Sequence, residues 1–418
     1  MIARISKFRR SMGDIPWALT DQALVSAVNF LTTILVARMV QIEEFGRFSI
    51  AWMIILLSKD LQNAFINSPM MSIGPKQREK YLPLYYGSAL VQQLAFAAAS
   101  FLFVFAGCEI ASVIIPHLFV PGFSLALAAA VVADQMQDFI RRYFYANERP
   151  VAVLVNDIVN CCSRLIVLFL LFRYSPTDSV GTLWVMCGCA LMAVAAGAFS
   201  VGSLKLDRDW IAATAQRHWG FSKWTTGNSI LRWLSSNLII LMAGSVLGPQ
   251  AIGAIRAAIN VLAPRNVLIL GLTNVVLVKG SRKYQTEGAP GLRHYLAKVT
   301  GLGLGFDVCV AILASSFADE IMFYLYGPDF VPYSFLIYWI ACINIIHFFS
   351  FPVGMGLQII EHTRPFFLSA IIEAAFGVLA SYFLVKWFAL PGTMSGLAVA
   401  NVILLCCLAP PLIRRLRR

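Results

Sequence analysis

The sequence has 418 residues, of which 59% are hydrophobic and only 13% are charged, and its mean hydropathy is +0.74. A soluble globular surface needs far more charge than this, so the composition excludes a water-soluble protein and favours one solvated mainly by lipid. A formal net charge of +12 could also indicate a nucleic-acid binder. The placement of the basic residues along the chain, described below, indicates membrane topology instead, and we expect no nucleic-acid partner.

Apolar runs of about 20 residues or more, the length needed to cross about 30 Å of hydrocarbon, follow one another along the chain. Transmembrane strands would be about ten residues long with alternating polarity, so these continuous runs predict helices. The sequence therefore predicts an all-α polytopic membrane protein with about twelve transmembrane helices. In chain order the predicted spans are 15–39, 45–72, 81–106, 121–145, 150–173, 180–204, 221–247, 251–278, 293–317, 332–358, 365–388 and 392–412.

Most of the Lys and Arg residues between these spans lie on one side of the predicted membrane. The basic segments of that side are 4–10, 76–80, 141–149, 205–223, 279–298, Arg364 and 414–418. The opposite side holds only Arg38, Arg47, Arg173 and Lys386. The positive-inside rule places the basic side in the cytoplasm, so we expect both termini there and an even number of spans.

Three kinds of site are missing from the sequence. No Gly-x-x-x-x-Gly-Lys-Ser/Thr phosphate loop occurs, so we expect no ATPase activity, and a gradient or the substrate itself would supply the energy for transport. The nine cysteines include no Cys-x-x-Cys pair, and the histidines have no ligand spacing. We therefore expect no disulfide, no metal centre and no cofactor.

The two halves of the chain resemble each other. Without a gap, Trp17 aligns with Trp224, Leu31 with Leu238 and Gly46 with Gly253, and further on Phe119-Val120-Pro121 aligns with Phe330-Val331-Pro332 and Arg149-Pro150 with Arg364-Pro365. We expect a duplication into parallel repeats of about six helices each, related by an axis along the membrane normal. The predicted lobes are 1–205 and 221–418, joined by a cytoplasmic linker at 206–220.

Two turn motifs resemble those of a known family. Ala37-Arg38 followed by Glu43-Glu44-Phe45-Gly46-Arg47-Phe48 is similar to the first hairpin of bacterial polysaccharide flippases of the Wzx type. These belong to the multidrug/oligosaccharidyl-lipid/polysaccharide (MOP, MATE-like) exporter superfamily. Tyr326-Gly327-Pro328-Asp329-Phe330 is similar to the corresponding motif of the second half.

The resemblance implies a function. It implies a flippase, not an enzyme, that moves undecaprenyl-pyrophosphate-linked oligosaccharide across the bacterial inner membrane for O-antigen or exopolysaccharide assembly, by alternating access. It also implies that polysaccharide polymerase and other assembly proteins are partners, along with membrane lipids. The alternative is a proton- or sodium-coupled small-molecule or multidrug exporter of the same superfamily. A membrane glycosyltransferase is disfavoured because the predicted outer loops are short.

Charged residues inside the spans are the candidates for substrate binding, because each costs at least about 2.5–3.5 kcal/mol to insert. In the seventh span Asn228 and Arg232 share one polar face with Ser235, and Arg232 lies near mid-membrane. We expect these basic groups to bind a diphosphate through charge-assisted hydrogen bonds, unless each neutralises a carboxylate. The full candidate set for substrate binding is Lys59, Arg164, Asn228, Arg232, Arg256, Asn260 and Arg265.

Acidic residues in the spans are candidates for coupling an ion to transport. Asp21, Asp60, Asp134 and Glu373 lie deep in predicted spans, where burial favours protonation or binding of a cation. Pairing with a basic residue is the competing interpretation. It is the expected one for a further acid near a span end, Asp138, whose helical spacing brings it close to the basic residues three and four positions on.

Overall fold

The computed structural model describes residues 2–175, 177–362 and 364–416. It leaves out the side chains of 2–16, 18, 19, 224, 267, 268, 270, 271, 274 and 275, so Arg4–Arg10 and the Trp224 ring lie outside the description, as do Arg417 and Arg418. Within the described residues the chain is 92% helical and has no strand. The predicted all-α class is therefore confirmed.

Nine helices of the described chain are long and apolar enough to cross a membrane. Two long helices join predicted spans: one contains both of the last two spans, and the other contains most of the ninth span and the end of the eighth. Helix α13 (Arg364–Leu416) has non-helical backbone at Ala389, between the two last predicted spans, and α10 (Ala263–Ser316) has it at Gly288. Pro391 and Pro290 follow these breaks two residues later, as expected where a new helix begins.

Contacts between Cα atoms divide the chain into two compact units, each described here by itself. Unit 1 contains 1–40 and 47–230, and unit 2 contains 41–46 and 231–418. The boundary falls within helix α8 (Arg208–Leu247), and residues 208–220 of the predicted linker form the beginning of this helix.

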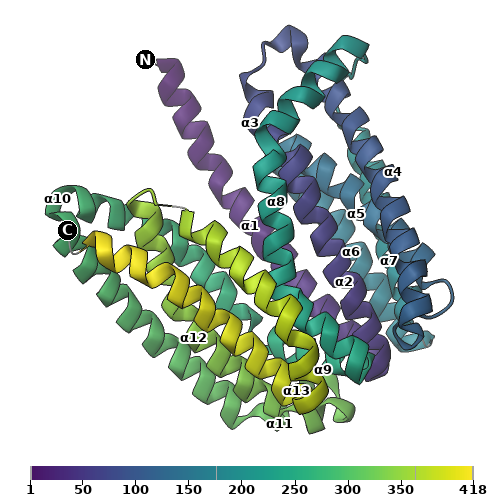
Figure 1. Ribbon diagram of the computed structural model, residues 1–418. Coiled ribbons are helices and arrows are strands. Elements are labelled where there is room, and N and C mark those ends of the chain that lie inside the picture. The colour runs from purple at the N-terminus through teal and green to yellow at the C-terminus, as the bar shows by residue number, and fades with distance from the viewer. Residues whose placement is uncertain (1, 176, 363, 417–418) are drawn as a thin grey trace. The chain divides into compact units, whose positions relative to one another are not determined.

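Unit 1 is built around helix α5 (Phe123–Ala146), most of which is buried. Four further helices lie wholly in this unit and are each at least 20 residues long: α1 (Ile2–Met39), α4 (Leu82–Ile114), α6 (Pro150–Tyr174) and α7 (Ser179–Ala198). Helix α5 contacts α4, α6 and α7, and α6 also packs against α1, an arrangement that Figure 1 shows. Small residues of α5 permit this close packing; Ala126, Ala128, Ala130 and Ala133 are all buried.

The predicted second span is formed in unit 1 by several consecutive helical pieces. Helix α2 (Ile42–Gln62), whose first five residues belong to unit 2, continues through a π-helical turn (Asn63–Asn67) into α3 (Ser68–Ile73). Asn67 lies in the π-helical turn, and its side chain is buried. Such turns in otherwise regular helices are frequent at functional sites.

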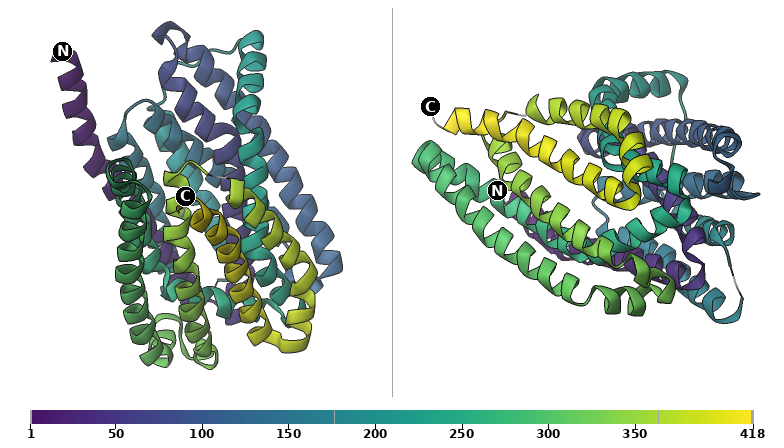
Figure 2. Two further views of the ribbon diagram at one scale, coloured as in Figure 1. Left: turned by 60° about the vertical axis from the view of Figure 1, so that its left-hand side comes forward. Right: turned by 60° about the horizontal axis from the view of Figure 1, so that its bottom comes forward.

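Unit 2 is organised around helix α12 (Phe335–Ile359), which contacts α9 (Pro249–Val261), α10 and α13. The short helix α11 (Ala318–Tyr326) links α10 to a 3-10 segment at Pro328–Tyr333. Figure 1 shows α10 turning back on itself beside its label, and in Figure 2 its arms run along α12. The non-helical residue Gly288 (φ 65°) lies at this turn.

The first and second turn motifs meet inside unit 2. The Phe45 ring contacts the rings of Tyr326 and Phe330, with centroids 6.3 Å and 5.7 Å apart. Beside it, Gly46 lies against Pro249, so closely that a Cβ atom would overlap the Pro249 carbonyl. Gly253 packs in the same way against the backbone of Ile42 and Gly46. The motifs therefore act together as a packing element of unit 2.

Two turns in the aligned parts of the halves have the same backbone conformation. Glu148 and Glu361 both have a positive φ, 54° and 57°, at the end of a long helix. The following amide donates back to a carbonyl five residues earlier in each case, Arg149 to Phe144 at 3.0 Å and His362 to Leu357 at 2.8 Å. In both halves an Arg-Pro pair lies at the start of the next helix, as the sequence alignment predicted.

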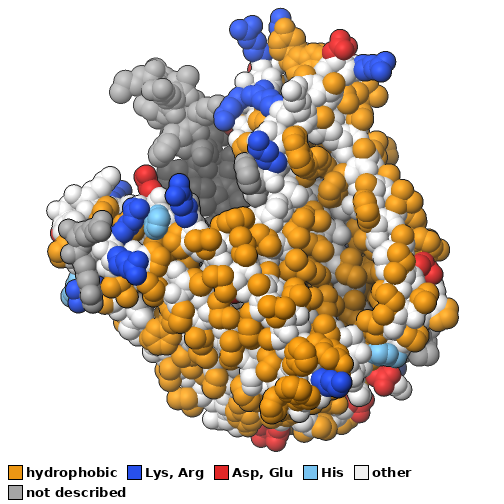
Figure 3. Space-filling view, viewed as in Figure 1, with side chains coloured by type: hydrophobic (Ala, Val, Ile, Leu, Met, Phe, Trp, Pro, Cys, Tyr) orange, Lys and Arg blue, Asp and Glu red, His pale blue; other side chains and the backbone are white. Residues whose placement is uncertain are grey.

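The surface agrees with a lipid environment. Large hydrophobic side chains are exposed along many helices, among them Phe103, Val113, Leu379 and Trp387. Figure 3 shows hydrophobic side chains over most of the visible face, with charged groups mostly near its margins. In water such a surface would cause aggregation, and in a bilayer it is the expected one.

Candidate functional site

Arg141 is the centre of a buried charge cluster in unit 1. Its Nη2 lies 2.6 Å from Oδ2 of Asp21 on α1, and its Nε lies 2.6 Å from Oδ2 of Asp157 on α6. Asp138, one turn earlier on α5, is 3.9 Å from the remaining nitrogen, Nη1. The Tyr145 hydroxyl also donates to Asp21, at 2.7 Å. One guanidinium thus ties three helices together.

Two amides also donate hydrogen bonds to carboxylates of this cluster. Asn67, from the π-helical turn, donates to Asp138 at 2.8 Å, and Gln137 donates to Asp157 at 2.7 Å. Arg142 lies 3.5 Å from Asp138, so the predicted pairing of Asp138 with the two following arginines is confirmed. The buried carboxylates are thereby compensated, which a low-dielectric interior requires.

A second ion pair of the same cluster joins α2 to α5. Lys59 Nζ lies 2.9 Å from Oδ2 of Asp134, with the Lys59 side chain 31% exposed. Arg164 is buried on α6 and donates to Asn160 at 3.3 Å. These residues line a cavity of about 60 Å³, and its charged walls are Lys59, Asp134, Asp138, Arg141, Asp157 and Arg164. The structure therefore brings Lys59 and Arg164 of the predicted substrate set into one place.

The predicted ion-coupling acids differ in their surroundings. Asp21 and Asp134 are buried and held in ion pairs, whereas the Asp60 side chain is exposed. Glu373 on α13 is half-buried in unit 2. Asp21 and Asp134 thus belong to the charge cluster, and Asp60 and Glu373 lie elsewhere in their units.

Arg265 in unit 2 binds one carboxylate through two of its guanidinium nitrogens. Its Nε donates to Oδ1 of Asp307 at 2.7 Å and its Nη2 to Oδ2 at 2.6 Å, and both side chains are almost fully buried. Nη2 also donates to the backbone carbonyl of Asn344, at 3.1 Å. This bidentate pair, with the bond to Asn344, joins the two arms of α10 to α12. Arg265 therefore neutralises a carboxylate, which was the alternative to substrate binding for a basic residue in a span.

Arg256 and Asn260 on α9 have neutral partners. Arg256 donates to the amide oxygen of Asn237 at 2.8 Å, and Asn260 donates to the Tyr326 hydroxyl at 3.0 Å. Arg232 on α8 is exposed and makes no ion pair with any described residue. Of the basic candidates in unit 2, Arg232 and Arg256 are therefore the ones without a bound carboxylate.

Sequence reasoning missed the central role of Arg141. It counted Arg141 among the basic residues of the cytoplasmic side, whereas the side chain on α5 is directed into the unit and is only 12% exposed. Asn237, the partner of Arg256, was not recognised either. The spacing of Arg141 from Asp138 was the available signal, but it did not reveal the contacts with Asp21 and Asp157 on other helices.

The remaining predicted residue, Asn228, is half-buried on the part of α8 that belongs to unit 1. Among the described residues, no group of three or more His, Cys, Asp or Glu side chains could hold a metal ion.

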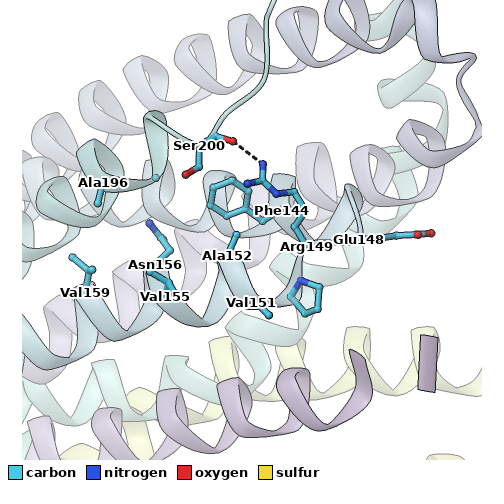
Figure 4. Close-up of a pocket in the computed structure, with 12 residues that line it drawn as sticks. Phe144, Glu148, Arg149, Val151, Ala152, Val155, Asn156, Val159, Ala196 and Ser200 are labelled. Carbon is cyan, nitrogen blue, oxygen red and sulfur yellow. Dashed lines mark hydrogen bonds between the residues drawn. The ribbon is translucent and has the colours of Figure 1, made fainter. Parts of the chain in front are cut away.

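A larger pocket of unit 1, about 510 Å³, lies where α5, α6 and α7 end or begin (Figure 4). Its polar groups are already engaged: Arg149 donates to the Ser200 carbonyl at 2.7 Å and stacks over Phe144, and Asn156 donates to the Ala193 carbonyl at 2.6 Å. Figure 4 shows Glu148 directed away from the other labelled side chains. This pocket therefore offers few unengaged polar groups to a ligand.

His218 occupies a fully buried position in unit 1, outside the apolar part of α8. Its Nε2 lies 2.9 Å from the Tyr85 hydroxyl, and the rings meet edge to face. Burial, aided by the positive charge of Arg217, lowers the pKa of His218 to about 4. The imidazole is consequently neutral at physiological pH, and its Nε2 forms a hydrogen bond with the Tyr85 hydroxyl.

Comparison with known proteins identifies the fold. No protein-family model and no curated protein matches the sequence. An inward-facing multidrug resistance MATE family transporter of the MOP superfamily aligns with a TM-score of 0.75 and 11% identity, over 93% of this chain and 94% of that one. The lipid II flippase MurJ, in an inward closed conformation, aligns with a TM-score of 0.70 and 12% identity, over 96% and 87% of the two chains.

A MOP superfamily transporter from Pyrococcus furiosus aligns with a TM-score of 0.60 and 11% identity, over 97% of this chain and 94% of the other. At such identities the likeness concerns the fold. The chain thus has the multi-pass helical fold of these transporters, and its structural neighbours are transporters and a flippase rather than enzymes.

Proposed function

We propose that this protein is a flippase for a diphosphate-linked oligosaccharide lipid, of the undecaprenyl-pyrophosphate type. The observation that carries the proposal is the state of Arg232 and Arg256: neither is bound to a carboxylate among the described residues. A guanidinium that is not bound to a carboxylate can bind an anionic ligand, and a diphosphate can accept bidentate hydrogen bonds from it.

Two further features support an anionic lipid as cargo. The chain shares its fold with the lipid II flippase MurJ, and its turn motifs resemble those of the Wzx type. Cargo with a sugar headgroup and a long apolar tail needs a polar path for the headgroup only, since the tail can remain in lipid. We propose alternating access between the repeats as the mechanism.

The remaining candidates take different roles in this proposal. Arg265, tied to Asp307, acts as a structural link, and Lys59 and Arg164 belong to the charge cluster of unit 1. Glu373 is the acid best suited to exchange a proton during transport, because Asp21 and Asp134 are already neutralised by basic partners.

The proposal is tested with purified protein in proteoliposomes. A fluorescent diphosphate-linked oligosaccharide lipid is placed in both leaflets, and a membrane-impermeant quencher measures how much reaches the outer leaflet. We expect rapid transfer with the wild type, at least tenfold slower transfer with Arg232→Ala, and partial recovery with Arg232→Lys. Arg415→Ala, an exposed arginine at the end of α13, is the matched control and should transfer like the wild type. Wild-type rates with a correctly inserted Arg232→Ala would contradict the anionic site.

A cation-coupled exporter is the alternative, and Glu373 favours it, because this acid of α13 makes no ion pair among the described residues and an acidic group suits cationic cargo. The same liposomes distinguish the two functions. Proton-driven efflux of a cationic dye, with no transfer of the lipid-linked oligosaccharide, would establish the exporter.

We also propose a bacterial inner-membrane location with both termini in the cytoplasm, on the basis of the basic segments. A reporter active only on the cytoplasmic side and fused after Arg418 should be active. A reporter active only on the outer side should be silent at the same position. The reverse result would contradict the even number of spans.

A further inference from the structure

The two arms of α10 and helix α12 enclose a groove in unit 2 with a volume of about 940 Å³. Its floor is apolar and consists of Leu272, Val276, Val299, Leu302, Phe306 and Phe348. Gly303 makes this floor possible, because a Cβ atom there would overlap the Phe348 ring. The volume lies at the upper end of the range for small-molecule sites, and the groove is large enough for an acyl chain.

The rim of the same groove is basic. Lys279 and Lys283 on the first arm and His294 and Lys298 on the second arm line it, and Glu287 is the one acid among the lining residues. Lys283 pairs with Glu287, whereas Lys279 and Lys298 are exposed and have no acidic partner among the described residues. Figure 3 shows basic side chains gathered over the region where Figure 1 labels α10.

The length of the groove from its basic rim along its apolar floor fits a lipid in one leaflet of the bilayer. On the first arm, Lys279 and the lining residue Ile269 are ten positions apart, which is about 15 Å along a helix. Half of the hydrocarbon core of a bilayer is also about 15 Å thick. A lipid whose phosphate lies at the basic rim would therefore place its acyl chain along the whole apolar floor.

We propose that this groove is a binding site for an acidic phospholipid of the surrounding membrane. Lys279 and Lys298 would bind the phosphate from both sides, and the apolar floor would hold one acyl chain. Basic pockets between membrane helices on the cytoplasmic side are typical sites for acidic headgroups. A zwitterionic lipid gains less from the rim, because its own cation would face two unpaired lysines.

The experiment uses the full-length protein in a mild detergent and compares dioleoyl phosphatidylglycerol with dioleoyl phosphatidylcholine, which has the same chains. Native mass spectrometry measures how many of each lipid remain bound, and a titration gives their affinities. We expect the wild type to bind the acidic lipid at least about tenfold more tightly, since each lysine near the headgroup adds to the attraction. Lys279→Gln with Lys298→Gln should abolish this preference.

Two further variants test the position of the ligand. Lys76→Gln with Arg78→Gln removes two exposed basic residues of unit 1 and should leave the preference unchanged. Phe306→Trp places an indole on the groove floor, and brominated phosphatidylglycerol should quench its fluorescence more strongly than that of the wild-type tryptophans. The thermal stability of every variant without added lipid shows whether it is folded.

Three outcomes would overturn the proposal. Equal affinity for the two lipids, or an unchanged preference after removal of both lysines in a folded variant, would mean that the groove is ordinary lipid-facing surface. Displacement of phosphatidylglycerol by substoichiometric undecaprenyl diphosphate would mean that the groove belongs to the cargo. Because binding is measured without transport, the result does not depend on the proposed flippase activity.

Discussion

Gly46 and Gly253, which align with each other in the two halves of the sequence, are in direct contact in the structure. A Cβ atom on Gly253 would come within 3.2 Å of the Gly46 nitrogen and within 2.6 Å of the Ile42 carbonyl oxygen. A Cβ atom on Gly46 would overlap the Pro249 carbonyl. Backbone therefore packs on backbone here, and only glycine leaves room for it.

Gly46→Ala or Gly253→Ala should consequently destabilise the protein, by about 1–3 kcal/mol each, because backbone must move to make room for the methyl group. Thermal unfolding in detergent measures the loss. Gly107→Ala is the matched control: Gly107 is also helical and nothing lies within 4 Å of its added Cβ, so it should be neutral or slightly stabilising. Equal unfolding temperatures for all three variants would contradict the close contact.

Arg141→Gln should be strongly destabilising, because it leaves the buried Asp21 and Asp157 without their basic partner. Breaking a buried pair from one side costs about 3–5 kcal/mol. Adding Asp21→Asn and Asp157→Asn to the same variant should recover most of the stability. Arg142→Gln, whose side chain is 30% exposed, should cost far less. If the triple variant unfolds as readily as Arg141→Gln alone, charge compensation is not the role of Arg141.

The Arg265–Asp307 pair permits a double-mutant cycle. Arg265→Met and Asp307→Leu should each destabilise unit 2 by about 3–5 kcal/mol, and the double variant by much less, because it removes both buried charges together. The double variant should also retain lipid transfer in the proteoliposome assay. A stable double variant that no longer transfers lipid would show that Arg265 contacts the cargo, as the sequence first suggested.

His218 should make the protein less stable in mild acid. Its folded-state pKa of about 4 lies below the ordinary value of 6.5, so the unfolded chain takes up a proton first as the pH falls. The loss in the free energy of unfolding therefore begins near pH 6.5, grows until about pH 4 and amounts to roughly 3 kcal/mol. Since carboxylates titrate in the same range, the measurement is the difference between the stability curves of wild type and His218→Gln. A constant difference between pH 7 and pH 4 would exclude this role.

The fold could largely be predicted from the sequence, because a membrane helix must be long, apolar and continuous. Arg149-Pro150 and Arg364-Pro365, which align in the sequence, follow turns that have the same backbone conformation. The breaks at Gly288 and Ala389 lie between predicted spans. Hydropathy alone separated these spans even where the helical backbone is nearly continuous.

The charge cluster was harder to predict because its bonds join distant parts of the chain. Asp21 and Arg141 are separated by 120 residues and Arg265 and Asp307 by 42, and no local spacing connects either pair. Only a contact within one helix was anticipated, that of Asp138 with Arg141 and Arg142. The sequence therefore indicated which residues needed partners, and the packing of the helices determined the partners.

The segment Gln41–Gly46 has a consequence for how the protein can be divided. Unit 2 includes this short segment from the first half of the chain, so no single cut produces two complete units. A gene split between codons 230 and 231 would yield a C-terminal fragment that lacks Ile42 and Gly46, the residues against which Pro249 and Gly253 pack. The two halves of the chain are therefore not independent modules, because the C-terminal half packs against Gln41–Gly46 from the N-terminal half.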